Sequence, residues 1–187
     1  MTLTKPIFRK KCLEKMKKIS THNKLYKNSQ MEKRLERILK QQRGKSILFY
    51  YPLDFEADLR KLLQKMRKRH NVFLPFMEGE SFKMVPFRLP LKKKKFDIFE
   101  AGNTLRDIKN IDIMIVPSIG IDGNFKRIGF GKGMYDRFFA KLHKKPYIIF
   151  VQPQLCFTQE KICDSYDITC NVVVTPEKTI QNRNKKG

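Results

Sequence analysis

The amino-acid sequence is short of several residue types, and each shortage excludes a class of protein. Its 187 residues include no Trp and three His, without the histidine pair of a zinc enzyme or a Ser-His-Asp pattern. The absence of a C-x-x-C pair argues against zinc ribbons and redox motifs. No apolar run approaches the ~20 residues of a membrane-spanning helix. These absences argue against those classes of enzyme and against a membrane-spanning protein.

The four cysteines, Cys12, Cys156, Cys163 and Cys170, bear on the cellular compartment. The charged N-terminus is not followed by the apolar stretch of a signal peptide. Without an export signal, we expect four reduced thiols in a cytoplasmic protein. Three of the cysteines recur at seven-residue spacing, but with no histidine nearby we interpret this as coincidence rather than as a zinc site.

Acidic residues are few: 18 Asp and Glu stand against 41 Lys and Arg, which gives a net charge of +23. About half of the excess lies in the first 45 residues. Such an asymmetry fits nucleic-acid binding, and it also fits solvated helix faces in a lysine-rich protein. A field of this sign attracts anionic small molecules as well.

The hydrophobic pattern predicts one domain over residues 1–187, with residues 179–187 as a frayed polar tail. Apolar periodicity predicts helices over 5–20, 24–42, 54–69 and 134–143. Short apolar runs predict strands over 46–51, 71–75, 111–116 and 147–151, and Pro86 makes 81–89 a hairpin or edge strand. Because strands alternate with helices, we expect a three-layer α/β fold with an open, largely parallel or mixed sheet.

The stretch 111–139 combines a buried strand, a glycine-rich turn and a helix. Gly129-Phe130-Gly131-Lys132-Gly133 precedes the helix, and backbone amides in such a place converge on an anion. Arg127 and Lys132 add positive charge, and Asp136 is placed to hold a divalent metal. The spacing matches neither a Walker A loop nor a Rossmann loop. Spacing alone therefore leaves open a phosphate site or a glycine-rich connection without a ligand.

The whole string, Arg-x-Gly-x-Gly-x-Gly-x-Tyr-Asp-Arg after an apolar strand, resembles the signature of the 5-formyltetrahydrofolate cyclo-ligase (5,10-methenyltetrahydrofolate synthetase) family. The resemblance is strong over 111–139 and patchy over 76–110. It implies an open α/β/α fold and the ATP- and Mg²⁺-dependent cyclisation of 5-formyltetrahydrofolate to 5,10-methenyltetrahydrofolate, with release of ADP and phosphate.

The resemblance also implies roles for individual residues. Arg127 and Lys132 would stabilise charge during catalysis, and Asp136 and Asp167 would hold the metal. Glu56, Tyr51 and Tyr135 would contact the folate. ATP would be bound by a Lys-x-x-x-Arg pair near the N-terminus and by the loop, that is, by Lys5, Arg9, Arg127, Gly129, Phe130, Gly131, Lys132, Gly133, Met134 and Tyr135.

Several positions depart from the family pattern. Leu59 stands where threonine is usual, Ala101 where proline is, Met134 where a first tyrosine is and Tyr166 where histidine is. We expect a monomer that acts on small molecules, with no membrane and no nucleic acid as its primary partner. Two alternatives remain: a basic nucleic-acid-binding protein on a degenerate enzyme scaffold, and another ATP-dependent ligase or kinase of the same fold.

Overall fold

The computed structural model describes residues 2–18, 23–93, 99–104, 108 and 110–185. The described helices are α1 (Lys5–Lys17), α2 (Lys24–Gln41), α3 (Arg60–Met66) and α4 (Met134–Ala140). The strands are β1 (Ser46–Leu48), β2 (Asn71–Glu78), β3 (Ser81–Pro86), β4 (Lys92–Lys93), β5 (Phe99–Glu100), β6 (Ile113–Pro117), β7 (Gly120–Ile121), β8 (Arg127–Ile128), β9 (Tyr147–Val151), β10 (Val172–Val174) and β11 (Thr179–Gln181).

Seven of these strands form one sheet in the order β11-β10-β9-β6-β1-β2-β3. The five central strands, from β10 to β2, pair in parallel, and the edge strands β3 and β11 pair antiparallel to their neighbours. The carboxyl ends of the parallel strands therefore share one edge of the sheet, where open α/β proteins bind ligands. The expected mixed, largely parallel sheet is confirmed.

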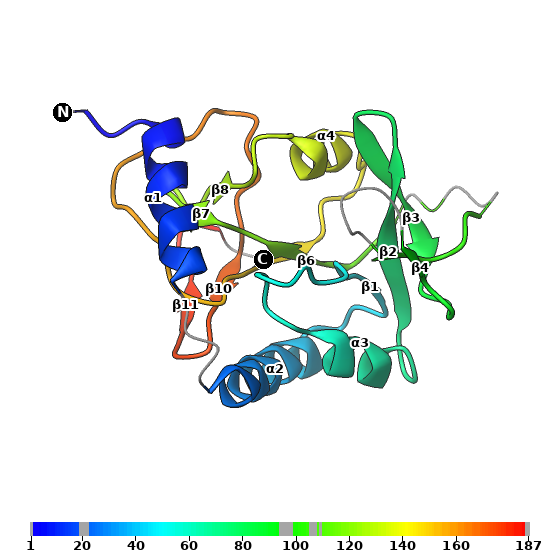
Figure 1. Ribbon diagram of the computed structural model, residues 1–187. Coiled ribbons are helices and arrows are strands. Elements are labelled where there is room, and N and C mark those ends of the chain that lie inside the picture. The colour runs from blue at the N-terminus through cyan, green and yellow to red at the C-terminus, as the bar shows by residue number, and fades with distance from the viewer. Residues whose placement is uncertain (1, 19–22, 94–98, 105–107, 109, 186–187) are drawn as a thin grey trace.

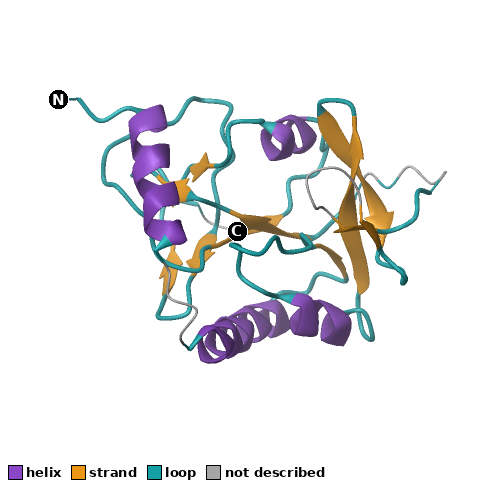
Figure 2. Cartoon of the chain, viewed as in Figure 1, coloured by secondary structure: helices purple, strands orange, loops and turns teal. Residues whose placement is uncertain are grey.

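Helices lie on both faces of this sheet, as Figures 1 and 2 show. Side chains alternate along a strand, so Ile113 and Ile115 of β6 pack in the cluster with α2 and α3. Met114 and Val116 point the other way and pack in the cluster with Phe138 of α4. The expected three-layer α/β fold is thus confirmed. Among the described residues, no helix has the length and apolarity needed to cross a membrane.

Two element boundaries differ from the sequence prediction for local reasons. The helix expected from residue 54 begins at Arg60, because acidic side chains bond to nearby backbone amides instead. Glu56 accepts from the amide of Leu53 at 3.0 Å, and Asp58 accepts from the amide of Arg60 at 3.1 Å. Strand β2 continues beyond Pro75, since β1 pairs only with Asn71–Phe73 and Pro75 lies where the strand has one neighbour.

The expectation of a frayed tail from residue 179 is wrong for Thr179–Gln181, which pair with β10 as β11. Asn182 then follows as a buried side chain, and its Nδ2 donates to the carbonyl of Cys170 at 2.9 Å. This bond ties the end of the chain to the segment before β10. Residues 186 and 187 lie outside the described part of the chain.

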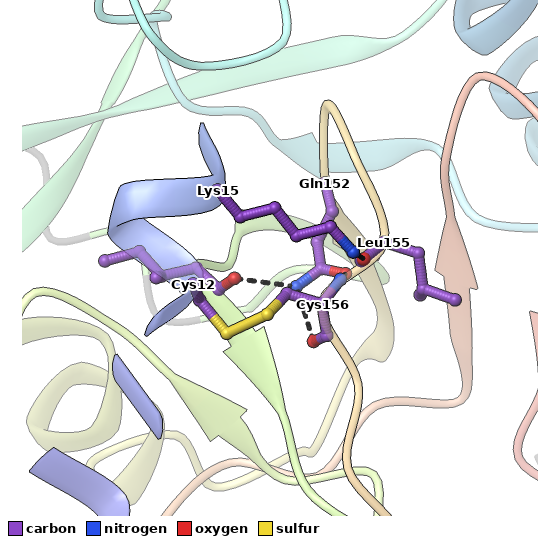
Figure 3. Close-up of a disulfide and its surroundings, with 6 residues drawn as sticks. Cys12, Lys15, Gln152, Leu155 and Cys156 are labelled. Carbon is purple, nitrogen blue, oxygen red and sulfur yellow. Dashed lines mark hydrogen bonds between the residues drawn. A yellow bond between two sulfur atoms is a disulfide. The ribbon is translucent and has the colours of Figure 1, made fainter. Parts of the chain in front are cut away.

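A disulfide corrects the expectation of four reduced thiols. Cys12 of α1 is bonded to Cys156 in the loop after β9, 144 residues away in sequence, while Cys163 and Cys170 are free. Figure 3 shows this bond beside Lys15, whose Nζ donates to the carbonyl of Leu155 at 3.0 Å. Sequence spacing could not reveal a partner so distant. The cysteines therefore no longer support the argument for a reducing compartment.

Candidate active site

The glycine-rich loop runs from the end of β8 to the start of α4, and each of its glycines has a physical reason. Gly131 and Gly133 have φ angles of 93° and 60°, a region in which side chains are disfavoured. A Cβ atom at Gly129 would lie 2.4 Å from Nη1 of Arg127. The loop therefore needs glycine for two backbone conformations and one close approach.

A pocket of about 610 Å³ opens above this loop. Its lining brings together eight residues that the sequence predicted for ATP or metal: Lys5, Arg9, Arg127, Gly129, Gly131, Gly133, Asp136 and Asp167. It also contains four that sequence reasoning did not assign: Arg137, Ala140, Asp164 and Tyr166. Residues from both ends of the chain thus meet at one pocket, which we call the phosphate-side pocket.

Helix α1 contributes two cations to the pocket, on the same side of the helix. Lys5 Nζ donates to Asp164 Oδ2 at 3.1 Å and also to Asp167 Oδ2. Burial opposes the charge on Lys5, but these hydrogen bonds outweigh it and raise its pKa. Arg9 Nε donates to the carbonyl of Gly129 at 2.8 Å. Together these contacts fasten α1 to the loop and to the segment before β10.

Arg127 enters the pocket from β8 as a buried side chain. Its Nε donates to the carbonyl of Pro117 at 2.9 Å, and its guanidinium lies 4.8 Å from the centre of the Tyr135 ring. Within the described part of the chain, no carboxylate forms an ion pair with Arg127. Its charge is held in place by neutral groups and remains available to an anionic ligand.

Asp136 is the better of the two predicted metal ligands. Its Oδ1 accepts from the amide of Ile168 at 3.1 Å, and its other oxygen has no partner among the described residues. Asp167 is engaged by Lys5 and by the amide of Asp164. The described residues contain no cluster of three metal-binding side chains. Mg²⁺ is often held by one or two carboxylates together with substrate phosphates, and Asp136 fits that mode.

The remaining predicted residues do not line the phosphate-side pocket. Lys132 is exposed on the loop, and Met134 is half-buried at the start of α4. Tyr135 is half-buried and packs edge-on against Phe82 with ring centres 5.0 Å apart. Tyr51 packs against Phe99 at 5.4 Å. The structure does not bring these four residues into the phosphate-side pocket, and it does not rule out their predicted roles. Those roles therefore stay predictions.

Glu56 lies in a second part of the site, which a residue of the loop also lines. It is buried, and burial raises its pKa to about 7, against the opposing effects of the Leu53 amide and the Arg127 charge. Glu56 lines a cavity of about 260 Å³ and a small one of about 10 Å³ that Phe130 also lines. Phe130 stands edge-on to Phe55, with ring centres 5.3 Å apart. We call these two cavities the ring-side cavities.

Phe130 joins the two parts of the site, because it lies between two glycines of the phosphate-side pocket and contributes to a ring-side cavity. Among the residues that sequence reasoning missed, Arg137 was visible as the last letter of the motif. Its side chain donates to the carbonyls of Glu80 and Lys132, which fixes the loop. Tyr166 donates to Asp164 Oδ2 at 2.9 Å, a contact that no motif signals.

Comparisons with known proteins find relatives of this chain among curated enzymes. The chain is 26% identical over 120 residues to the 5-formyltetrahydrofolate cyclo-ligase of Haemophilus influenzae, covering 59% of this chain. It is 28% identical over 131 residues to a probable 5-formyltetrahydrofolate cyclo-ligase of Schizosaccharomyces pombe, covering 60% of this chain. The aligned part spans 64% of the length of each of these relatives.

Solved structures share the fold over nearly the whole chain. The NMR structure of Aquifex aeolicus 5,10-methenyltetrahydrofolate synthetase superposes with a TM-score of 0.83 at 24% identity, covering 99% of this chain and 96% of that one. A 5,10-methenyltetrahydrofolate synthetase from Mycoplasma pneumoniae gives 0.72 at 20% identity, covering 93% and 99%.

The sequence model of one family matches residues 2–176, and its description is 5-formyltetrahydrofolate cyclo-ligase family. That range includes the glycine-rich loop, the N-terminal Lys5 and Arg9, and the segment of Asp164 and Asp167. The fold agrees with the same assignment. This chain therefore belongs to the 5-formyltetrahydrofolate cyclo-ligase family.

Proposed function

We propose that the protein converts 5-formyltetrahydrofolate to 5,10-methenyltetrahydrofolate and splits ATP into ADP and phosphate. One observation carries the proposal: cations from α1 and β8 surround a glycine-rich loop at the carboxyl edge of the sheet, next to cavities that contain a buried carboxylate. The first part suits the phosphates of ATP and the second suits a heterocycle with N–H donors. The protein would act on small molecules as a monomer.

The chemical difficulty is that a formyl oxygen on nitrogen is a poor leaving group. In the proposed reaction this oxygen attacks the γ-phosphorus, and the bond to ADP breaks. Folate N10 then bonds to the formyl carbon and loses its proton, and the oxygen departs with the phosphate. The step needs positioning and cationic stabilisation rather than a nucleophilic side chain.

The roles follow from position. Lys5, Arg9 and Arg127 would hold the phosphate oxygens, and the loop glycines would let the backbone approach them. Lys132 would add charge during transfer from its place on the exposed loop. Asp136 would hold Mg²⁺, which supplies charge neutralisation to the phosphates. Glu56 would accept hydrogen bonds from the folate ring, with Tyr51 and Tyr135 among its aromatic surroundings.

An absorbance assay tests the proposal directly. The protein is mixed with 5-formyltetrahydrofolate, ATP and Mg²⁺, and the near-ultraviolet band of the methenyl product is followed. We expect the band to grow only when ATP and Mg²⁺ are both present. No band from a protein that still binds ATP would favour another ligase or kinase of this fold. Failure to bind ATP as well would favour the nucleic-acid-binding alternative, whose affinity falls steeply with salt.

A further inference from the structure

Ser118 carries a buried hydroxyl without a hydrogen-bond partner. It directly follows β6, at the carboxyl edge of the sheet, and its exposed fraction is 4%. Its Oγ has no partner among the described residues. Buried hydroxyls are nearly always paired, because leaving one unpaired costs stability. An exception at this edge needs an explanation.

The backbone around Ser118 is fixed on both sides, so a small shift would not relieve the hydroxyl. The amide of Ser118 donates to the carbonyl of Val151 at 3.1 Å, and the amide of Ile119 donates to that of Ile128 at 3.0 Å. The carbonyl of Pro117, the preceding residue, accepts from Arg127 Nε at 2.9 Å. The backbone at Ser118 is therefore held by neighbouring strands and by a residue of the phosphate-side pocket, and only the side chain is free to rotate.

Ser118 lines the small ring-side cavity together with Glu56 and Phe130. Its Oγ itself has almost no accessible surface, so a rotation about χ1 would bring the hydroxyl into this cavity. The volume of this cavity, about 10 Å³, is near that of one water-sized probe. It shares Met16, Glu56 and Pro153 with the larger cavity of about 260 Å³. The small cavity is thus large enough for one polar atom, and the shared residues place it beside the larger cavity.

The second unpaired buried atom, Nδ1 of His70, makes a useful contrast. His70 immediately precedes β2, so it lies at the amino edge of the parallel strands, away from the site. It lines none of the three cavities described above. Of the two unpaired buried atoms among the described residues, the hydroxyl of Ser118 is the one that belongs to a residue lining a cavity of the site.

We propose that the Ser118 hydroxyl forms a hydrogen bond with the ring of the bound folate, beside Glu56, and helps to set specificity for that ring. The proposal rests on the proposed function and adds a substrate-binding residue to it. A 2-amino-4-oxopyrimidine ring carries N–H donors next to a carbonyl. A carboxylate accepts from the donors, and a hydroxyl, which both donates and accepts, complements the carbonyl. Sites with buried polar groups discriminate against ligands that leave those groups unpaired.

The test measures binding of 5-formyltetrahydrofolate, and separately of ATP, by calorimetry, together with the melting temperature of the free protein. Ser118→Ala should weaken folate binding about three- to tenfold, which is the worth of one neutral hydrogen bond. ATP affinity should stay within twofold. The melting temperature should stay the same or rise, because the variant removes a buried hydroxyl that has no partner.

Two further variants separate hydrogen bonding from packing. Ser118→Cys keeps most of the volume but is a weak donor, so it should lose folate affinity much as alanine does. Ser46→Ala removes a hydroxyl that already bonds to Asp112 Oδ2 at 2.8 Å, at the other edge of the sheet. It should lower the melting temperature and leave folate affinity unchanged.

The outcomes distinguish this proposal from the proposed function. Wild-type folate affinity in Ser118→Ala would overturn the role of Ser118, as would full recovery in Ser118→Cys. Equal losses for folate and ATP together with a lower melting temperature would make the residue structural and also overturn it. If the wild-type protein binds ATP but no 5-formyltetrahydrofolate, the proposed function fails first and the role of Ser118 fails with it.

Discussion

The two parts of the site are built in different ways. The phosphate-side pocket is open and charged, and its shape comes from one glycine-rich loop with cations from α1 and β8. The ring-side cavities are smaller, and their residues come from separate loops and helices around one buried carboxylate, that of Glu56. A short sequence motif can encode a phosphate site, because backbone amides and a few charged side chains are enough to bind phosphate. Recognition of a ring depends on packing among residues that are far apart in sequence.

The largest expected effect concerns the disulfide. The bond joins α1 to the loop after β9 and so helps to keep Lys5 and Arg9 of α1 in the phosphate-side pocket. Replacing Cys12 and Cys156 together by alanine should lower the free energy of unfolding by about 3–5 kcal/mol, given the long loop that the bond closes. The affinity for ATP should fall more than that for folate, because α1 supplies two of the three cations proposed to hold the phosphates, Lys5 and Arg9, but not the buried carboxylate of the ring-side cavities. Denaturant unfolding and calorimetry measure both effects.

Reducing agent provides the control for this comparison. It should destabilise the wild-type protein to the level of the double variant and have no effect on the double variant itself. Equal stability of the two proteins without reducing agent would contradict a structural role for the bond. Equal losses of ATP and folate affinity would contradict the separation of the two parts of the site.

The next effect concerns Glu56 and tests whether the ring side is shielded from water. Its pKa is raised to about 7 in the folded protein, so the folded state holds this proton more tightly than the unfolded state does. This tighter proton binding stabilises the folded state. The contribution is complete below the ordinary pKa of a glutamate and is lost as the pH rises through 7. Between pH 5 and 8, wild-type stability should therefore fall relative to Glu56→Gln by at most about 3 kcal/mol.

Denaturant unfolding of both proteins across this pH range measures the difference. Glu36→Gln is the matched control, because Glu36 is only half-buried and hydrogen bonding to Lys65 lowers its pKa. Glu36 stays ionised in both states over this range and should add no slope. Parallel stability curves for the wild type and Glu56→Gln would show that Glu56 is solvated.

The same contrast explains how much the sequence could predict. The periodicities predicted the α/β layers, and the glycine motif with Lys5 and Arg9 identified most of the phosphate-side pocket. The start of α3 was missed because Glu56 and Asp58 bond to local amides, which periodicity does not register. The Cys12–Cys156 pairing and the unpaired hydroxyl of Ser118 depend on tertiary packing, so no local pattern signals them.

A smaller effect is expected at Lys132, the exposed cation of the loop. Lys132→Ala should reduce kcat about 10²-fold if this charge stabilises the transferring phosphoryl group. The variant is easier to interpret than one at Arg127, whose buried side chain also supports the fold. Lys141→Ala, another exposed lysine just after α4, is the control and should keep wild-type turnover. Unchanged turnover in Lys132→Ala would remove Lys132 from the mechanism.

The smallest effect is expected at Asp136. It tests whether this carboxylate binds Mg²⁺ or only supports the fold. Asp136→Asn keeps an oxygen that can accept from the Ile168 amide but removes the negative charge that attracts Mg²⁺. The Mg²⁺ concentration at half-maximal activity should rise about tenfold, while the melting temperature of the free protein changes little. Asp167→Asn should instead lower the melting temperature, because it breaks the ion pair with Lys5. An unaltered Mg²⁺ titration in Asp136→Asn would make its bond to Ile168 the reason for the carboxylate, and Mg²⁺ would then be held by groups other than Asp136.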